Sequence, residues 1–232
     1  MYDAVVAWHY AAYRPPLHEL IVGEALADLS FSCGLDIGCG TGHSTIALAN
    51  HCDRVIGVDQ SQSMLDQAIR HPKVRYHLGS GEELPLAGSS MDIVTLAGVL
   101  SYLDPAKTRS ELLRVCCRNA YVLPHDFEVS TEELNLLFGL SAGCKNNEYD
   151  HSASFSGSTG MSTVKQVARN IEFGVSNWQA THLLLSNNTR IDALAKKYET
   201  LDPFDHVVKK LDETGWSKKL SANIYYTLHQ LV

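Results

Sequence analysis

A glycine-rich turn constrains the fold of this chain more than any other feature of its sequence. The turn reads Leu35-Asp36-Ile37-Gly38-Cys39-Gly40-Thr41-Gly42, and it joins an apolar run over 31–37 to a pattern of helical spacing over 43–50. Because glycine adopts positive φ and has no Cβ, the backbone of such a turn can approach a ligand closely at the helix N-terminus. We therefore expect a ligand directly above Gly38 to Gly42.

The charge around the turn indicates which ligand it binds. A dinucleotide places its pyrophosphate against a G-x-G-x-x-G turn, whereas the sixth position here is His43. Asp36 lies just before Gly38, the first glycine of the turn. A carboxylate at this position would repel a pyrophosphate and attract a cationic group. S-adenosylmethionine, which carries an ammonium and a sulfonium group, fits this charge. In the alternative interpretation, the Asp36 carboxylate binds neighbouring N–H groups and has a structural role.

A second buried strand is predicted over 54–58, and it also ends in an acid. Asp59 follows this strand about twenty residues beyond the glycine turn. In a sheet of this topology, an acid at that spacing accepts hydrogen bonds from ribose hydroxyls. Asp59 therefore predicts an adenosine-containing ligand, a description that fits both NAD and S-adenosylmethionine.

Four segments of the chain resemble, in order and spacing, the motifs of class I S-adenosylmethionine-dependent methyltransferases. They are 35–42, 57–61, 79–86 and 91–97, so the resemblance covers roughly the first half of the chain. It is closest to the small-molecule branches, such as the trans-aconitate and quinone-biosynthesis types. Tyr13-Arg14-Pro15 also resembles the trans-aconitate type.

The resemblance implies that the cofactor is S-adenosyl-L-methionine, that the product is S-adenosyl-L-homocysteine, and that a defined set of residues binds them. Those residues are Gly38, Cys39 and Gly40 at the methionine moiety, Asp36 at the ammonium, Asp59 and Gln60 at the ribose, Ser80, Gly81 and Glu82 at the adenine edge, and Leu96 and Ala97 beside the sulfonium. Tyr13 and Arg14 are expected to close the site from the N-terminal segment. The chain departs from the family pattern where Ser80-Gly81 replaces Asp-Ala and where Ser101-Tyr102 replaces His-Trp.

Strand and helix patterns alternate from Leu35 onward, which predicts a parallel sheet with crossover helices. Strands are expected over 34–37, 54–58, 74–78, 91–97, 119–124, 179–185 and 221–232, and helices over 42–50, 62–70, 105–117, 129–144 and on either side of Pro203. Two further helices between residues 3 and 29 are separated by Arg14-Pro15-Pro16. The expected fold is a Rossmann-like, doubly wound α/β sheet of seven strands, mostly parallel with an antiparallel edge strand.

One domain is expected from the length of 232 residues. Its parts are a helical cap over 1–30, a cofactor-binding core over 31–125, a lid and acceptor region over 126–178 that includes a mobile loop at 152–163, and the completion of the sheet over 179–232.

The net charge of −7, without a basic stripe, argues against a nucleic-acid substrate. No apolar run long enough to span a membrane and no leader sequence are evident, which favours a cytoplasmic protein with a small-molecule substrate. The six cysteines form no CxxC pair, so no metal site is expected.

Methyl transfer from a sulfonium is an in-line displacement of an activated leaving group, so holding the acceptor in line supplies most of the acceleration. A general base is needed only for an acceptor that is protonated at neutral pH. The candidates for that role are His125 and Asp126, just past a predicted strand, and His9 and His151 are less favoured. Two other functions remain open: a catalytically silent S-adenosylmethionine-binding protein, and an NAD-dependent oxidoreductase, which His43 and Asp36 disfavour.

Overall fold

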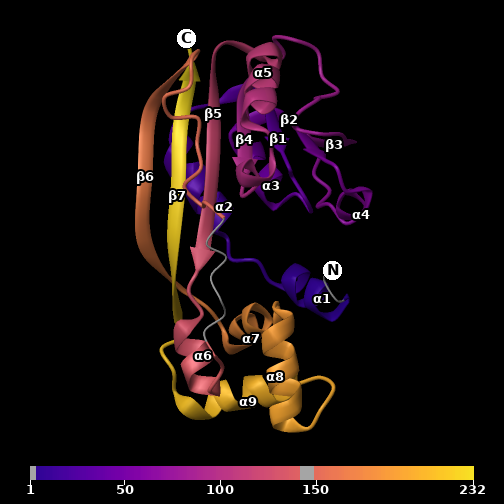
Figure 1. The fold of residues 1–232 in the computed structure, drawn as a ribbon, viewed down its shortest axis with the longest axis vertical. Helices are drawn as coiled ribbons and strands as arrows, with labels where there is room; N and C mark the ends of the chain where they lie inside the picture. The colour runs from indigo at the N-terminus through magenta and orange to yellow at the C-terminus, as the bar shows by residue number, and fades with distance from the viewer. Residues whose placement is uncertain (1–3, 142–148) are drawn as a thin grey trace. The chain divides into compact units, whose positions relative to one another are not determined.

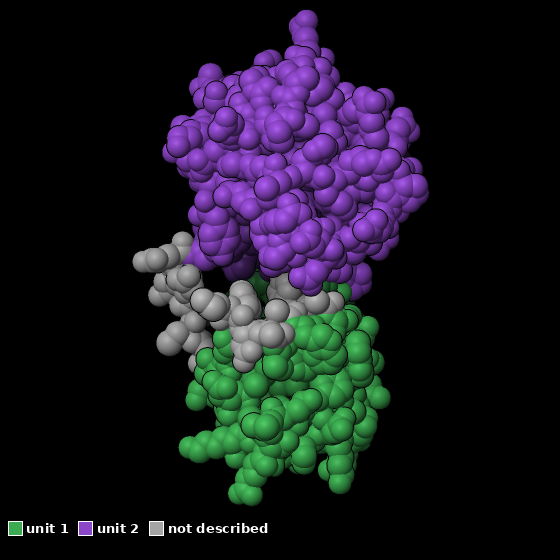
Figure 2. All heavy atoms as spheres, turned by 90° about the vertical axis from the view of Figure 1, so that its right-hand side faces the viewer, with its two compact units in different colours: residues 1–15, 128–147, 170–223 green, residues 16–127, 148–169, 224–232 purple. Residues whose placement is uncertain are grey.

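The computed structural model describes residues 4–141 and 149–232. Its contacts divide the chain into two compact units, which are described separately (Figure 2). Unit 1 comprises residues 1–15, 128–147 and 170–223, and unit 2 comprises residues 16–127, 148–169 and 224–232. Within the described ranges, no helix has the length and apolarity needed to cross a bilayer.

A sheet forms the centre of unit 2, and the described residues give it seven strands in the order β3-β2-β1-β4-β5-β7-β6 (Figure 1). The strands are β1 (Phe31–Ile37), β2 (Cys52–Asp59), β3 (Val74–Leu78), β4 (Met91–Ala97), β5 (Cys116–Val129), β6 (Met161–Gly174) and β7 (Lys219–Leu231). The β3-β2-β1-β4-β5 pairs are all parallel. Figure 1 shows β7 running opposite to β5. The predicted Rossmann-like sheet, mostly parallel with antiparallel strand pairing near one edge, is therefore confirmed.

The strand order reverses between β1 and β4, because β1 pairs with β2 on one side and with β4 on the other. In open α/β sheets a ligand binds at such a switch point, outside the carboxyl ends of the strands. The middle strands carry runs of buried apolar residues, as parallel strands covered on both faces require. Leu35, Val94 and Val122 belong to this core.

Helices in unit 2 join these strands. They are α2 (Leu17–Leu26), α3 (His43–Ala49), α4 (Gln62–Leu65), the 3-10 helix η1 (Leu100–Tyr102) and α5 (Pro105–Val115). Helix α5 begins where the Asp104 carboxylate accepts hydrogen bonds from the N–H groups of Ala106 and Lys107, with Pro105 at the first helical position. Helix α4 is shorter than the predicted 62–70 and ends at Leu65.

Unit 1 contains α1 (Ala4–Ala12), α6 (Glu132–Phe138), α7 (Asn177–Leu185), α8 (Asn188–Tyr198) and α9 (Phe204–Thr214). They pack around a core of their own that includes Leu134, Phe138, Leu184 and Trp216. The predicted helices on either side of Pro203 are confirmed, and so are the two N-terminal helices. The helix predicted over 129–144 covers only 132–138 and ends at Gly139 in the left-handed conformation, and residues 142–148 of that prediction lie outside the described residues.

Two predictions of secondary structure were wrong. The strand predicted over 179–185 is part of α7, because Ser176 and Gln179 form a capping box and the following apolar residues are buried on a helix. Residues 161–174, expected to belong to a lid, form β6 at the edge of the sheet. Most residues of β6 are exposed and polar, so no buried apolar pattern marks it in the sequence.

Candidate cofactor and acceptor site

The glycine turn connects β1 to α3 at the switch point of the sheet. Gly38, Gly40 and Gly42 all have positive φ, at 68°, 52° and 90°. A Cβ at Gly38 would lie 2.5 Å from Val99 Cγ2, and one at Gly42 would lie 2.2 Å from the Tyr76 hydroxyl oxygen. A Cβ at Gly40 would meet no atom within 4 Å. Gly38 and Gly42 are therefore needed for packing, whereas Gly40 borders open space where a ligand can approach.

Backbone N–H groups of the turn are already bonded within the chain. Gly38 and Cys39 donate to the Val58 carbonyl oxygen at 2.8 and 3.1 Å, Gly40 donates to Asp59 Oδ2 at 2.8 Å, and Gly42 donates to the Cys39 carbonyl oxygen at 2.8 Å. A pyrophosphate at a helix N-terminus is bound by free N–H groups. Because these four groups are used, they are not available to a diphosphate.

Asp36 lies beneath the turn and has no exposed surface. Its Oδ2 accepts hydrogen bonds from Ser44 and Thr45, both at 2.6 Å, and its Oδ1 accepts one from Thr95 at 2.8 Å. Burial raises the pKa of the Asp36 carboxyl above its ordinary value, and the three hydroxyl hydrogen bonds oppose that shift. The expected direct contact with an ammonium group is thus not supported by this geometry. Asp36 instead fixes α3 and β4 to β1, which is the structural alternative.

Asp59 is half-buried at the end of β2, and its two carboxylate oxygens bind different parts of the site. Oδ2 accepts from the Gly40 N–H and Oδ1 accepts from the Ser61 N–H, both at 2.8 Å. An ionised carboxylate offers about four lone-pair positions, so each oxygen can accept one further hydrogen bond. The predicted ribose contact of Asp59 fits this arrangement. Gln60, beside it, is exposed, and its cofactor contact stays a prediction.

Residues 80–82 follow β3. A Cβ at Gly81 would lie 2.6 Å from Ile37 Cγ2, which explains why this position departs from the family's alanine. Ser80 Oγ accepts from the Glu82 N–H at 3.1 Å, and Glu82 accepts from the Asp104 N–H at 2.9 Å. The Glu82 carboxylate thus supports the start of α5, and the adenine contact of these residues stays a prediction.

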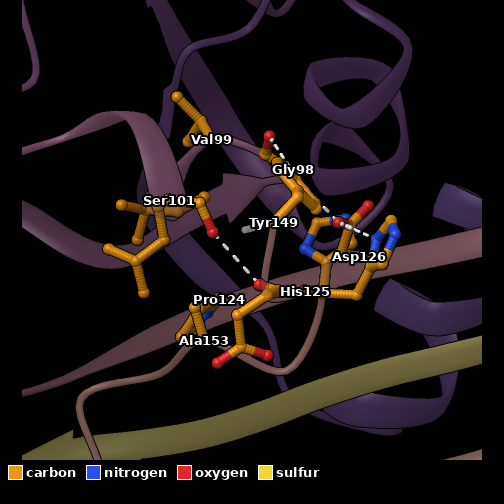
Figure 3. Close-up of a pocket in the computed structure, with 12 residues that line it drawn as sticks. Gly98, Val99, Ser101, Pro124, His125, Asp126, Tyr149 and Ala153 are labelled. Carbon is orange, nitrogen blue, oxygen red and sulfur yellow. Dashed lines mark hydrogen bonds and ion pairs between the residues drawn. The ribbon is translucent and has the colours of Figure 1, made fainter. Parts of the chain in front are cut away.

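A small pocket lies at the carboxyl end of β4, beside residues 124–126 within β5 (Figure 3). It is lined by Leu96, residues 98–101, residues 124–126, residues 149–151 and Ala153. Its volume of about 10 Å³ matches a single water molecule. Ala97 ends β4 beside this pocket, and the predicted contacts of Leu96 and Ala97 with the sulfonium stay predictions.

A polar network that sequence reasoning missed surrounds the pocket. Asp126 Oδ2 lies 2.7 Å from His151 Nδ1 and 2.9 Å from the Tyr149 hydroxyl, which also lies 2.8 Å from the Gly98 carbonyl oxygen (Figure 3). The His151 ring stacks on the Tyr225 ring, with centroids 6.0 Å apart. Asp126 and His151 were each candidates from the sequence, but no local pattern indicated that they meet, because residues 149–151 lie in a segment without secondary-structure pattern.

His125 also lines the pocket, but its ring nitrogens are bonded elsewhere. It is 3% exposed, its Nε2 lies 3.2 Å from His18 Nδ1 and its Nδ1 lies 3.4 Å from the Leu123 carbonyl oxygen. Burial lowers the pKa of His125 to about 4. Both ring nitrogens are therefore engaged inside the protein. The expectation that His125 serves as the general base is not supported by this geometry, which instead fits a packed, neutral histidine.

Tyr13 and Arg14 belong to unit 1, whereas the other predicted cofactor residues belong to unit 2. Within unit 1, Tyr13 packs against the core around Leu134 and Phe138, and burial raises the pKa of its hydroxyl. The contact of Tyr13 and Arg14 with the cofactor stays a prediction. Across the described residues, no group of three or more His, Cys, Asp or Glu side chains is placed to hold a metal ion.

Comparison with known proteins shows which families and folds these features resemble. Residues 35–123 match the methyltransferase domain family model. An uncharacterized methyltransferase of Mycobacterium bovis is 39% identical over 83 residues, which are 35% of this chain and 34% of that protein. The chain spans about a third of the length of the curated relatives it matches first.

Solved structures share the fold. A protein provisionally assigned as a Type II methyltransferase from Anaeromyxobacter dehalogenans aligns with a TM-score of 0.66 at 20% identity, over 93% of this chain and 97% of that one. Geranyl diphosphate C-methyltransferase from Streptomyces coelicolor, solved with S-adenosyl-L-homocysteine, aligns with a TM-score of 0.52 at 13% identity, over 93% of this chain and 76% of that one. Residues 35–123 are thus similar in sequence to a methyltransferase domain, and the fold is shared with solved methyltransferases.

Proposed function

We propose that this protein transfers a methyl group from S-adenosylmethionine to a small-molecule acceptor. The observation that carries the proposal is the glycine turn at the switch point, where the N–H groups of Gly38, Cys39, Gly40 and Gly42 are bonded internally and the space above Gly40 is open. Asp59 lies beside that space, and its carboxylate oxygens can accept further hydrogen bonds from a ribose. This combination favours a cationic nucleoside over a diphosphate.

The pocket between the end of β4 and residues 124–126 of β5 is the proposed acceptor side of the site. Carboxyl ends of neighbouring parallel strands meet at one edge of the sheet, so an acceptor there would lie in line with a donor held above β1 and β4. Holding two reactants in line lowers a barrier by roughly 7–11 kcal/mol, which is enough to account for most of such a displacement. The trans-aconitate or quinone-biosynthesis type of acceptor and a cytoplasmic location stay predictions.

A second candidate function is binding of S-adenosylmethionine without catalysis. The pocket volume of about 10 Å³ favours this candidate, because an acceptor larger than water would have to displace side chains. Production of S-adenosylhomocysteine in the presence of an acceptor separates the two functions. An NAD-dependent oxidoreductase is less favoured, because the N–H groups of Gly38, Cys39, Gly40 and Gly42 are all bonded within the chain.

Two matched glycine variants test the cofactor assignment. Gly40 and Gly139 both have positive φ, at 52° and 64°, and a Cβ at either position meets no atom within 4 Å. Gly40→Ala and Gly139→Ala therefore carry the same backbone strain, but only Gly40→Ala places a methyl group in the proposed cofactor space. We expect S-adenosylhomocysteine affinity, measured by calorimetry, to fall about tenfold or more in Gly40→Ala, or at least about 1.4 kcal/mol, and to be unchanged in Gly139→Ala.

The same titration with S-adenosylmethionine and NAD completes the test for the wild-type protein. We expect binding of the first and no binding of the second. Equal S-adenosylhomocysteine affinities for the two alanine variants, or tighter binding of NAD than of S-adenosylmethionine, would show that the turn is not the cofactor site.

A further inference from the structure

We propose that His151 is the general base of the transfer, that Asp126 positions it, and that the acceptor is a weakly acidic hydroxyl group of the phenol type. The inference rests on the proposed function, since it concerns the acceptor side of the same site. It is carried by the contacts among Asp126, His151, Tyr149 and Tyr225, all within unit 2.

The contact with Asp126 fixes the tautomer of His151. A carboxylate only accepts hydrogen bonds, so the Nδ1 atom, 2.7 Å from Asp126 Oδ2, carries the proton. The lone pair of the neutral ring is then on Nε2. A carboxylate that holds an imidazole in one tautomer and later stabilises the imidazolium is the arrangement by which His acts as a base in many enzymes.

The orientation of the ring is fixed from both sides. Tyr225 of β7 stacks on His151 with an interplanar angle of 15°, and the Tyr149 ring meets it edge-on at 4.6 Å between centroids. The side chain of His151 is 32% exposed and lines the pocket, so the ring is held in place but is not buried. His125 differs, because it is buried and both of its nitrogens are engaged.

The hydrogen-bonding groups of the pocket can receive a hydroxyl acceptor. Asp126 Oδ1 accepts from the Phe127 N–H at 2.7 Å, and Oδ2 contacts His151 and Tyr149. Asp150, which also lines the pocket, accepts from the N–H and hydroxyl of Ser152 through Oδ1. A hydroxyl acceptor needs only one hydrogen-bond acceptor for its proton, and the lone pair of His151 Nε2 supplies it.

The acidity of the acceptor follows from the strength of the base. An imidazole assists removal of a proton from a phenol, whose pKa is about 10, better than from an alkyl alcohol, which is a far weaker acid. A carboxylic acid is already ionised at neutral pH and requires no base. A positioned base is therefore expected for a phenolic acceptor and not for a carboxylate acceptor of the trans-aconitate type.

The step balances without any further reactant. The acceptor oxygen forms a bond to the methyl carbon as the bond from that carbon to sulfur breaks, and the electron pair of the broken bond stays on sulfur. The sulfonium becomes the neutral thioether of S-adenosylhomocysteine. The hydroxyl proton moves to His151 Nε2, and the resulting imidazolium is paired with the Asp126 carboxylate.

The test compares acceptors that do and do not need deprotonation. Wild type, His151→Gln, Asp126→Asn and the control His206→Gln are assayed for S-adenosylhomocysteine production with phenol, catechol and pentafluorophenol, the last being ionised at the assay pH. His206 is an exposed histidine of unit 1 that stacks on Tyr198. We expect His151→Gln to lower kcat with phenol and catechol by roughly 10²- to 10⁴-fold and to leave the rate with pentafluorophenol within about threefold.

Asp126→Asn should show the same dependence on the acceptor, because an amide N–H facing Nδ1 favours the tautomer that puts the proton on Nε2. His206→Gln should match wild type. An equal loss for all three acceptors, no loss, or binding of S-adenosylhomocysteine without methylation of any of these hydroxyl compounds would overturn the inference. Absence of S-adenosylhomocysteine binding by the wild-type protein would instead overturn the proposed function.

Discussion

His229 provides a quantitative test of how burial controls the stability of unit 2. This side chain of β7 has no exposed surface; its Nε2 accepts from the Phe155 N–H at 3.3 Å and its Nδ1 lies 3.3 Å from the Thr163 hydroxyl. Burial lowers the pKa of His229 to about 4. Protonation of Nε2 would break the hydrogen bond from Phe155 and leave a charge in an apolar environment.

The sign of the pH effect follows from that lowered pKa. The unfolded chain binds a proton at His229 near pH 6.5, whereas the folded chain does so near pH 4, so the unfolded state binds more protons between these values. The contribution of the neutral ring to stability is complete above about pH 6.5 and is lost as the pH falls toward 4. At about pH 5 the loss for this single residue comes to about 2 kcal/mol.

The perturbation is His229→Gln, which keeps an acceptor for the Phe155 N–H and removes the titration. Urea unfolding followed by circular dichroism at about pH 7.5 and about pH 5 gives the free energy of unfolding of both proteins. Tryptophan fluorescence recorded in parallel reports on unit 1, because the three tryptophans, Trp8, Trp178 and Trp216, lie there. The wild type should lose about 2 kcal/mol more than the variant between the two pH values.

His206→Gln, which changes an exposed histidine of unit 1, serves as the control and should follow the wild-type pH dependence. A difference between wild type and His229→Gln that stays constant within about 0.5 kcal/mol from pH 7.5 to pH 5 would refute the reasoning. Such a result would mean that His229 has the same proton affinity in the folded and unfolded chains.

Further predictions concern the cofactor turn. The side chain in Asp59→Asn cannot accept hydrogen bonds from the Gly40 N–H, the Ser61 N–H and a ribose together, so the S-adenosylhomocysteine affinity measured by calorimetry should fall by about 1.5–3 kcal/mol, roughly tenfold or more. The control Asp66→Asn, which changes an exposed residue, should bind normally. Equal affinities for the two variants would argue against the ribose contact. Gly42→Ala brings a Cβ within 2.2 Å of the Tyr76 hydroxyl oxygen at a φ of 90°, and should lower stability in thermal unfolding by about 1–3 kcal/mol. That loss should be smaller in a Tyr76→Phe background, and additive effects of the two changes would contradict the assigned clash.

The local pattern of the sequence was sufficient to predict the cofactor half of the sheet. The strand at 91–97 was predicted with its observed bounds, and the turn at Gly38 to Gly42 was placed correctly between a strand and a helix. Such predictions succeed because a parallel strand buried on both faces must be apolar throughout, and a turn with positive φ requires glycine. Both requirements act on neighbouring residues, so they are visible in the sequence.

Where the local sequence pattern is ambiguous, only the tertiary structure determined whether a segment forms a helix or a strand. The apolar run at 179–185 fits a short strand as well as a helix, and only its capping by Ser176 and its packing in unit 1 make it α7. Strand β6 is mostly exposed and polar, and it exists because it pairs with β7, more than forty residues away in sequence. Pairing partners at such distances leave no local signal.

For the candidate site as well, some features could be predicted from the sequence and others could not. The sequence by itself determined that an acid would stand at Asp59 beside a glycine turn, because both belong to one local motif. Only tertiary structure decided that Asp36 is enclosed by three hydroxyls, that His125 is packed against His18, and that His151 meets Asp126. These outcomes depend on burial and on contacts between segments far apart in the chain, and burial controls both the charge of an ionisable group and the access of a ligand to it.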